Sequence, residues 1–414
     1  MTRPFRTVSA VIGALALVLA TAACGGGFDD KSPQQQQGAK ADLQILIGSS
    51  GEAETNAVKS AAAAWASASG NTATVTPAQD IGQQLGQAFA GGTPPDVFYV
   101  DASRFADYAS VGALEPYADK VSGGVDDFYP ALRETFTYQG KLYCIPKDFS
   151  TLALQINTDL WAKAKLTDGD YPTTWDQLTS VAQKLKAAGI TPFTIGDTRD
   201  RIGAFMVAAG GWIVSKDGTQ ATADTPQNLQ ALQYVQTLLK NGLAVYPKQV
   251  DTGWGGEAFG KGKVAIAMEG NWIKGALQND FPNIKYVVKP MPAGPSGMGT
   301  LSFTQCWGIS AKSKFKDQAV KFVEAMTTAD QQIAFAKAFG VMPSRASAKA
   351  TYLQQFPNDQ AFIDSAAFAQ GPVNAPKMDS VLADFDSQLQ GLVKGNPKTI
   401  LERLQKNVDT ALKG

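Results

Sequence analysis

From Asp42 onward, the pattern of hydrophobic and polar residues alternates between the period of a strand and the period of a helix. In residues 42–48, apolar side chains recur at every second position, which predicts a strand with one buried face. The next segment, 53–69, is rich in alanine and ends at Gly70, and this predicts a helix with a glycine stop. The chain therefore begins its folded part as a strand followed by a helix.

The same alternation continues along the chain. Further strands are expected at 72–78, 94–101, 263–268 and 284–288. Further helices are expected near 82–90, from the capping box Thr174-Trp175-Asp176-Gln177 to Gly189, from Pro226 to Asn241, and as two amphipathic helices over 316–340, the second opened by a capping box at Thr328. Alternation of this kind favours an α/β fold, in which ligands bind at the carboxyl ends of strands.

The first residues of the chain have the pattern of an export signal. Arg3 and Arg6 precede an apolar run at 11–20, which has signal-peptide length and is too short to span a bilayer. The small residues before Cys24 resemble a bacterial lipobox, in which the cysteine is lipidated and becomes the mature N-terminus. We therefore expect 1–23 to be a lipoprotein signal peptide.

Residues 24–40 are expected to be a flexible tether. Their glycine, glutamine, proline and charged residues cannot bury enough apolar surface to fold. No second hydrophobic run of spanning length follows in the sequence. The expected product is anchored to the outer face of the cell membrane by its N-terminal lipid alone.

Composition narrows the classes of function. The chain has 414 residues, 37 basic and 37 acidic side chains, and no histidine. Zero formal charge argues against nucleic acid as a partner. The absence of histidine excludes Ser-His-Asp and Cys-His nucleophile systems and removes the commonest metal ligand. No phosphate-binding loop or dinucleotide motif occurs, so we expect no cofactor and no metal.

Polar and aromatic side chains gather directly after predicted strands. Others lie in the segment 146–150 and at 304–307, directly before a short strand at 308–310. The candidate positions are Ser49, Glu52, Tyr99, Asp101, Asp148, Ser150, Asn271, Trp272, Gln305 and Trp307. Sugars need this mixture, because their hydroxyls require bidentate acceptors and their C–H faces stack on aromatic rings. Each residue alone is explained as well by capping or packing, so the interpretation depends on their joint placement.

Several longer motifs appear in one order along nearly the whole chain. They are PPDVFYVD (94–101), YQGKLYCIPKDFSTLALQINTDLW (138–161), PTTWDQL (172–178), GWGGEAF (253–259), FGKGKVAIAMEGNW (259–272), PMPAGPSG (290–297) and WGIS (307–310). In this order, they resemble the maltose-binding-like class of extracellular solute-binding proteins, the carbohydrate-binding lipoproteins of bacterial ABC importers.

The resemblance implies a two-lobed, periplasmic-binding-protein-like fold with hinge crossover strands and a ligand cleft between the lobes. Lobe one would hold 41–147 and 307–365, and lobe two would hold 149–303 and 370–414. The crossovers would lie near Cys144–Phe149 and Ser302–Trp307.

The resemblance also assigns roles to individual residues. Asp101 matches an acidic ligand contact and Trp272 matches a stacking aromatic ring. Ser150 stands where relatives have an acidic contact, which brings Asp148 forward as a substitute. Leu382 stands near another stacking position, for which Trp254 is the substitute, and the turn containing Arg201 would face the cleft.

The resemblance places the remaining two cysteines, Cys144 and Cys306, on neighbouring crossover strands. An oxidising compartment then favours a disulfide between them, and two buried free thiols are the alternative.

The leading interpretation is a non-enzymatic and monomeric receptor that captures a sugar or oligosaccharide and delivers it to an ABC permease. A surface-anchored glycoside hydrolase, using carboxylates such as Asp101, Asp148 and Glu269, is one alternative. A receptor for a non-sugar solute is the other.

Overall fold

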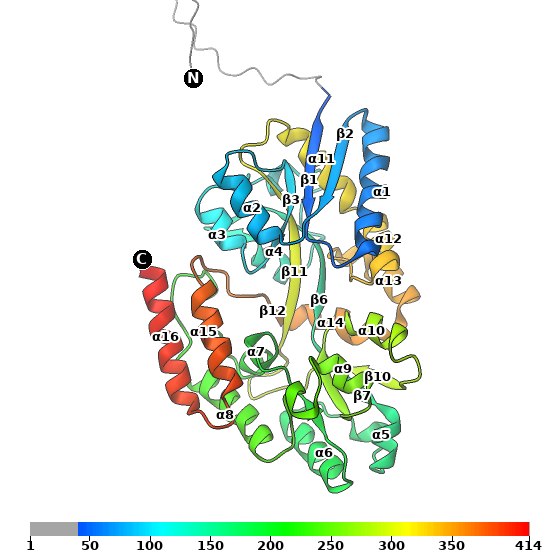
Figure 1. Ribbon diagram of the computed structural model, residues 1–414, viewed down its shortest axis with the longest axis vertical. Helices are drawn as coiled ribbons and strands as arrows, with labels where there is room; N and C mark the ends of the chain where they lie inside the picture. Colours follow the sequence, from blue (N-terminus) through cyan, green and yellow to red (C-terminus); the bar gives the residue numbers. More distant parts are fainter. Residues whose placement is uncertain (1–39, 414) are drawn as a thin grey trace, which may run out of the picture. The chain divides into compact units, whose positions relative to one another are not determined.

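The computed structural model describes residues 40–413 (Figure 1). The expected signal peptide, the expected lipidation site Cys24 and nearly all of the expected tether lie outside the described residues. Sheets and helices in the described range form two hydrophobic cores. We call lobe one the part built around the core that draws on 41–145 and 306–335, and lobe two the part built around the core that draws on 152–301 and 373–408. The two cores confirm the expected α/β class.

Lobe one is built on a sheet with strand order β12-β11-β3-β1-β2. Its strands are β1 (Asp42–Ile47), β2 (Thr72–Pro77), β3 (Val97–Asp101), β11 (Thr300–Ile309) and β12 (Ala369–Gln370). β1 pairs in parallel with β2 and β3, and β11 runs antiparallel to β3. The helices of this lobe are α1 (Glu52–Ser69), α2 (Ile81–Ala90), α3 (Phe105–Ser110), α11 (Lys316–Met326) and α12 (Ala329–Phe339).

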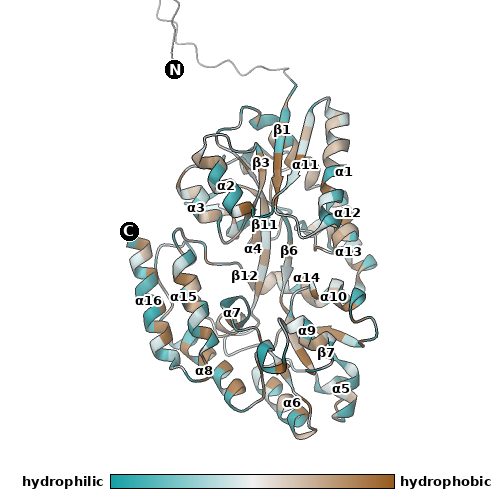
Figure 2. Ribbon diagram, viewed as in Figure 1, coloured by the Kyte–Doolittle hydropathy of each residue, from teal (hydrophilic) through white to brown (hydrophobic). Residues whose placement is uncertain are grey.

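Local sequence explains the first elements of lobe one. In β1, Leu43, Ile45 and Ile47 are buried while Asp42 and Gln44 are exposed, as the two-residue period predicts. Helix α1 ends at Gly70, whose φ of 71° lies in the left-handed region that glycine adopts without strain. Figure 2 shows β1 and β3 coloured as hydrophobic inside the lobe, while the covering helices carry polar residues.

Lobe two is built on a sheet with strand order β10-β7-β9-β8. Its strands are β7 (Ala153–Asn157), β8 (Phe193–Thr194), β9 (Ile266–Glu269) and β10 (Tyr286–Lys289). Its helices are α5 (Thr158–Lys163), α6 (Trp175–Ala187), α7 (Arg199–Ala208), α8 (Pro226–Lys240), α9 (Gly255–Gly260), α10 (Ile273–Asn279), α15 (Asp379–Gln390) and α16 (Pro397–Lys413). The two C-terminal helices α15 and α16 pack beside α7 and α8 (Figure 1), so the end of the chain returns to lobe two.

Two long strands join the lobes. β6 (Ile145–Thr151) continues almost directly into β7 of lobe two, and it pairs antiparallel with β11, which extends from lobe two into lobe one. These are the two segments that the resemblance expects to cross between lobes. β12 supplies a third connection and pairs with the start of β11.

A third apolar cluster lies beside the crossover strands. It contains α4 (Pro130–Thr135), α13 (Lys349–Gln355) and α14 (Gln360–Asp364), packed around Phe149 and Ala153. The segment 342–365, expected in lobe one, therefore packs against residues from both sides of the hinge. The remaining short elements are the hairpin β4 (Thr137–Tyr138) and β5 (Lys141–Leu142) and the 3-10 turns Ala118–Lys120, Asp168–Asp170, Pro247–Val250, Ala346–Ala348, Pro357–Asp359 and Ser365–Phe368.

The pairing of β6 with β11 contains a β-bulge. Asp148 lies opposite Gln305 and Pro146 lies opposite Cys306, so Lys147 is an extra residue without a partner on β11. A bulge bends its strand and increases the local twist. The bend lies where the chain leaves lobe one for lobe two.

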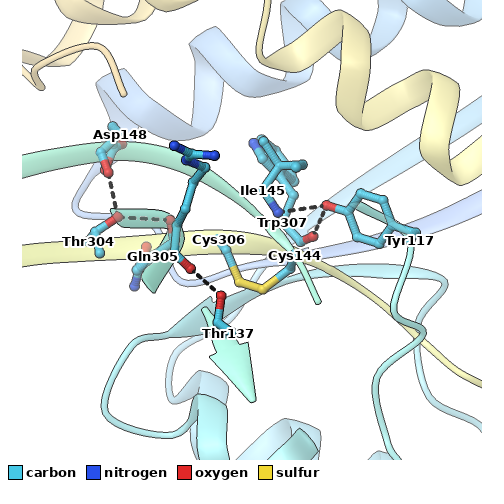
Figure 3. Close-up of a disulfide and its surroundings, with 10 residues drawn as sticks. Tyr117, Thr137, Cys144, Ile145, Asp148, Thr304, Gln305, Cys306 and Trp307 are labelled. Atoms are coloured by element: carbon cyan, nitrogen blue, oxygen red, sulfur yellow. Dashed lines mark hydrogen bonds between the residues drawn. A yellow bond between two sulfur atoms is a disulfide. The ribbon is translucent and has the colours of Figure 1, made fainter. Parts of the chain in front are cut away.

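Cys144 and Cys306 form a disulfide at the lobe-one end of the crossover (Figure 3). Their Cα atoms are 5.7 Å apart, and both side chains are buried. The Tyr117 hydroxyl lies beside them, donating to the Trp307 carbonyl and accepting from the Ile145 amide at 3.1 Å. The disulfide and the tyrosine together hold the two strands at their lobe-one end.

Candidate ligand-binding cleft

A cavity of about 440 Å³ opens between the two lobes, directly over the crossover strands. Residues of lobe one, of both crossover strands, of lobe two and of the segment after β12 line it. The lining is Asp101, Ala102, Ser103, Asp148, Arg199, Asp200, Trp212, Leu301, Ser302, Phe303, Thr304, Gln305, Gln370, Pro372 and Val373. Of the residues expected in the site, the structure brings Asp101, Asp148 and Gln305 together here.

Asp101 lies at the carboxyl end of β3 and is exposed. Its Oδ1 accepts hydrogen bonds from the amide and the hydroxyl of Ser103, at 2.9 and 2.7 Å. Within residues 40–413, Oδ2 has no hydrogen-bond partner. The turn after β3 thus orients one carboxylate oxygen and leaves the other for a ligand.

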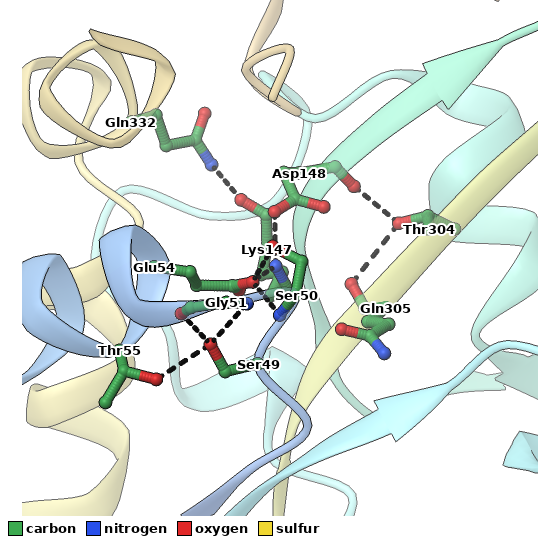
Figure 4. Close-up of polar contacts among 10 residues, drawn as sticks. All are labelled: Ser49, Ser50, Gly51, Glu54, Thr55, Lys147, Asp148, Thr304, Gln305 and Gln332. Atoms are coloured by element: carbon green, nitrogen blue, oxygen red, sulfur yellow. Dashed lines mark hydrogen bonds and ion pairs between the residues drawn. The ribbon is translucent and has the colours of Figure 1, made fainter. Parts of the chain in front are cut away.

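Asp148 shares a buried charge network with Lys147 and Glu54 (Figure 4). The Lys147 ammonium pairs with the Asp148 carboxylate and with Glu54 Oε1 at 2.9 Å, and it lies 4.6 Å from the centroid of the Tyr99 ring. Ser50 donates to Glu54 Oε2 from its amide at 2.8 Å and from its hydroxyl at 2.7 Å. A paired cation makes the burial of two carboxylates possible.

The pKa values follow from this arrangement. Burial raises the pKa of Asp148, and the Lys147 ammonium opposes only part of the rise. Burial also raises the pKa of Glu54, but Lys147 and the hydrogen bonds from Ser50 outweigh it and leave that pKa below its usual value. Burial would lower the pKa of Lys147, yet the surrounding negative groups raise it, so the lysine is firmly protonated.

The expected contacts after β1 need correction. Ser49 accepts and donates hydrogen bonds within its own turn, and Glu52 is exposed on the first turn of α1. Neither lines the cavity. The inward-facing acidic residue is Glu54, two positions along the helix and thus on a different face. Its partner Lys147 stands next to Asp148 in the sequence, but no pattern in the sequence predicts the ion pair between Lys147 and Glu54.

Tyr99 and Trp307 also lie away from the cleft. Both are wholly buried in the core of lobe one, where their rings meet edge to face with centroids 4.8 Å apart. Trp307 packs against Phe322 on its other side. Their neighbours Phe98, Val100 and Cys306 are buried as well, so this part of β3 and β11 lies inside the core. The two strands reach the cleft further along, at Asp101 and Gln305. A ligand cannot contact either ring in this arrangement.

Trp272 lies in lobe two, directly after β9, and 38% of its surface is exposed. Its ring meets Phe303, a lining residue of the cavity, edge to face at a centroid distance of 5.1 Å. The Arg201 guanidinium lies 5.1 Å from the centroid of the indole, and Glu269 accepts a hydrogen bond from each. Neither Arg201 nor Trp272 is itself a lining residue. Trp272 therefore borders the cavity through Phe303.

Three other expected contacts have structural partners. Ser150 and Asn271 are buried and hydrogen-bond to each other, and Asn271 Nδ2 also donates to the Gly340 carbonyl at 2.9 Å. Trp254 is half-buried and packs against the apolar cluster around Phe259. None of the three lines the cavity.

Sequence reasoning missed several lining residues. Trp212 lies beside Gly211 in the sequence, as Trp254 and Trp307 lie beside glycine, and nothing else in the sequence distinguishes it. Ser302 is buried, and its hydroxyl has no hydrogen-bond partner among the described residues. Arg199 pairs with Asp386, whose pKa burial raises against the pull of this arginine. The Ser302 hydroxyl is thus a buried polar group without a described partner in the wall of the cleft.

Within residues 40–413, no group of three or more cysteine or carboxylate side chains is arranged to hold a metal ion. In the same range, no helix combines the length and the apolar character that crossing a bilayer requires.

The sequence matches the family model described as bacterial extracellular solute-binding protein over residues 60–369. The chain belongs to this family. As a family member it is an extracytoplasmic binding protein and not an enzyme, which confirms the leading interpretation at that level.

Individual relatives of this solute-binding protein are distant. A putative binding protein of Brucella abortus is 27% identical over 82% of this chain and 85% of its own length. The diacetylchitobiose binding protein of Streptomyces coelicolor is 25% identical over 88% of this chain and 87% of its own.

Solved structures share the fold of this solute-binding protein. The cyclic alpha-maltosyl-1,6-maltose binding protein from Arthrobacter globiformis superposes with a TM-score of 0.81, at 21% identity, over 91% of this chain and 100% of that chain. The maltotriose binding protein of Thermus thermophilus gives a TM-score of 0.71, at 24% identity, over 90% and 100%. These matches confirm the two-lobed architecture.

Proposed function

We propose that this protein captures a sugar or oligosaccharide in the cleft between its lobes and delivers it to an ABC permease. The observation that carries the proposal is the lining of the cleft. Two carboxylates from lobe one and the hinge, Asp101 and Asp148, face a cavity bordered by the aromatic rings of Trp212 and Phe303. Carboxylates accept hydrogen bonds from hydroxyl groups, and the rings suit the apolar faces of a pyranose.

The names of the relatives support a carbohydrate ligand. The curated relatives include a diacetylchitobiose binding protein, a maltotriose-binding protein and a multiple sugar-binding protein. A cavity of about 440 Å³ is within the usual range for small-ligand sites. We therefore propose a ligand of one to a few sugar rings.

We further propose which residues contact this ligand. Asp101, Asp148, Ser302 and Gln305 supply hydrogen bonds, and Trp272 supplies a stacking face at the rim. Contacts from both lobes would draw the lobes together around the sugar by rotation at the crossover strands.

The N-terminal anchor is part of the same proposal. Lipidation at Cys24 after removal of residues 1–23 would keep a monomeric receptor at the outer face of the membrane, beside its permease. Fatty-acid labelling of the full chain and of Cys24→Ala tests this point. Labelling that persists in Cys24→Ala contradicts it.

A thermal-shift panel tests the function directly. Mature protein is heated with monosaccharides, with disaccharides and trisaccharides that include diacetylchitobiose and maltotriose, and with amino acids and quaternary amines. A stabilising sugar is expected, because a ligand that binds only the folded state raises the melting temperature. Stabilisation by amines alone would overturn the sugar proposal in favour of a non-sugar solute.

The hydrolase alternative has no support from the carboxylates. Asp148 is paired with Lys147, and Glu269 is paired with Arg201, so neither is a free acid or nucleophile. Recovery of the stabilising sugar uncleaved after long incubation is the expected result.

A further inference from the structure

Trp272 is one of only three large hydrophobic side chains that are exposed among the described residues, with Val111 and Met298. An exposed indole normally samples more than one rotamer. Trp272, however, has three contacts, which come from three different segments of lobe two and the hinge.

The first contact is a hydrogen bond from the indole Nε1–H to Glu269 Oε2, at 3.1 Å. The second is the Arg201 guanidinium, whose Cζ lies 5.1 Å from the centroid of the indole. The third is the edge of Phe303 at 5.1 Å. The same Glu269 Oε2 accepts from Arg201 Nη2 at 2.6 Å, so one oxygen fixes both the indole and the cation beside it.

The surroundings of Glu269 are fitted to this carboxylate. Its side chain is 2% exposed at the carboxyl end of β9. A Cβ atom at Gly255 would lie 2.6 Å from Glu269 Oε1, and a Cβ atom at Gly270 would overlap the Trp272 ring. Only glycine at these two positions leaves room for the carboxylate and for the indole to fold back over it.

Burying a carboxylate is costly unless the group is paired and hydrogen-bonded. Both of the partners that donate hydrogen bonds to the Glu269 carboxylate, Arg201 and Trp272, pack against Phe303, which lines the cavity. Within residues 40–413, this carboxylate accepts no other hydrogen bond. The contacts of the Glu269 side chain therefore fix two residues at the edge of the candidate site.

We propose that Glu269 is a positioning residue that fixes the ring of Trp272 as a stacking platform before the ligand arrives, with Arg201 as the second half of the clamp. This inference depends on the proposed function only in that Trp272 contacts a sugar. A ring already held in its bound rotamer loses less conformational freedom on binding, and this strengthens affinity without adding any contact to the ligand.

The test has a readout that needs no ligand. Protein labelled with ¹⁵N at its tryptophan side chains gives one indole N–H resonance per ring, and Trp272→Phe assigns the Trp272 resonance by its disappearance. Glu269→Gln and Arg201→Lys should each shift or broaden that resonance and leave the other indole resonances in place. Arg201→Lys keeps the charge but loses the planar guanidinium. It is the variant to test if Glu269→Gln does not fold.

Affinity for the sugar found in the thermal-shift panel is the second readout. We expect Glu269→Gln to weaken binding roughly three- to tenfold, the range for one side chain that must be ordered on binding. In Trp272→Phe, which lacks the indole N–H, adding Glu269→Gln should weaken binding no further. The matched control is Glu257→Gln, which alters a partly buried carboxylate paired with Lys261 in the same lobe and should change neither readout.

The two proposals fail in different ways. An unchanged Trp272 resonance in both Glu269→Gln and Arg201→Lys overturns the positioning role, and so does wild-type affinity for the sugar in both. A shifted Trp272 resonance in a protein that no sugar stabilises supports the positioning role and overturns the proposed function instead.

Discussion

Arg104 at the start of α3 forms an ion pair with Asp379 at the start of α15, and the pair joins lobe one to lobe two. A second bond lies beside it, from the Lys377 amide to Asp107 Oδ1 at 2.7 Å. Both side chains of the ion pair are about half exposed, at 49% each. The two lobes are therefore linked here by an exposed ion pair, which salt weakens.

We expect Arg104→Gln to loosen this link between the lobes at low ionic strength. Exposed pairs contribute about 0–1 kcal/mol, so the shift in the balance between joined and separated lobes should be small and should vanish in high salt. Small-angle scattering of the ligand-free protein should show a slightly larger radius of gyration for the variant. Lys120→Gln, which breaks a pair within lobe one, is the control, and equal curves for all three proteins at low salt contradict the prediction.

Trp272→Ala should weaken sugar binding by about 1–3 kcal/mol, because stacking and apolar contact are lost at an aromatic platform. Isothermal titration calorimetry with the sugar identified in the panel measures the change. Val111→Ala, which truncates another exposed apolar side chain, should bind as the wild type does. Unchanged affinity in Trp272→Ala would remove this residue from the site.

Binding through Asp148 should depend on pH. Because burial raises its pKa, the carboxyl takes up a proton at a higher pH than an ordinary aspartate does. Affinity should fall as the pH drops from neutral through this raised pKa, since a protonated carboxyl accepts hydrogen bonds less well. Asp148→Asn should bind more weakly at neutral pH and show a flatter profile, and parallel profiles for the two proteins would contradict the prediction.

A rise in pH changes the stability of the fold in opposite directions through the two acids of this network, Asp148 and Glu54. The folded state holds the Asp148 proton more tightly than the unfolded chain does, so this residue makes the fold less stable as the pH rises through its pKa. Glu54 has a lowered pKa, and its contribution to stability is present at neutral pH and lost as the pH falls through that pKa.

Replacing both Cys144 and Cys306 with serine should destabilise the protein. The two residues are 162 positions apart, and closing a loop of that length stabilises the folded state by about 5 kcal/mol on the chain-entropy model, with measured values often smaller. Chemical denaturation of the double variant and the wild type measures the difference. Mass spectrometry of alkylated, unreduced protein provides the direct check, and alkylation of both cysteines would show that the bond does not form.

Periodic patterns in the sequence predicted the elements that depend on local chemistry. The strand expected at 42–48 is β1, and the helix expected from Pro226 is α8. The predicted cap at Thr174 accepts from the Gln177 amide, but the Gln177 side chain returns to Thr173 and not to Thr174. The capping pattern therefore predicted the start of α6 correctly. It was wrong by one residue about the partner of the Gln177 side chain.

The candidate site was harder to predict, because tertiary pairing determines which side of an element faces the cleft. Glu52 and Glu54 are indistinguishable as acids after a strand, and only the contact with Lys147 shows that the second one turns inward. Trp307 sits in a turn-like glycine context in the sequence, yet pairing of β11 with β3 directs it into the core. Asp101 was predictable because the end of a central strand is fixed by topology alone.

The bulge at Lys147 has a consequence for changes in chain length. Because the residues on either side of it are paired in register with β11, removing this one residue would leave the ladder of each lobe intact. The deletion would change the bend of β6, and with it the angle at which lobe two leaves lobe one. It would also remove the cation that Asp148 and Glu54 share, at a cost in stability. Deleting this residue would therefore change the width of the cleft. Deleting one residue inside β7 would instead turn every later side chain of that strand to the opposite face.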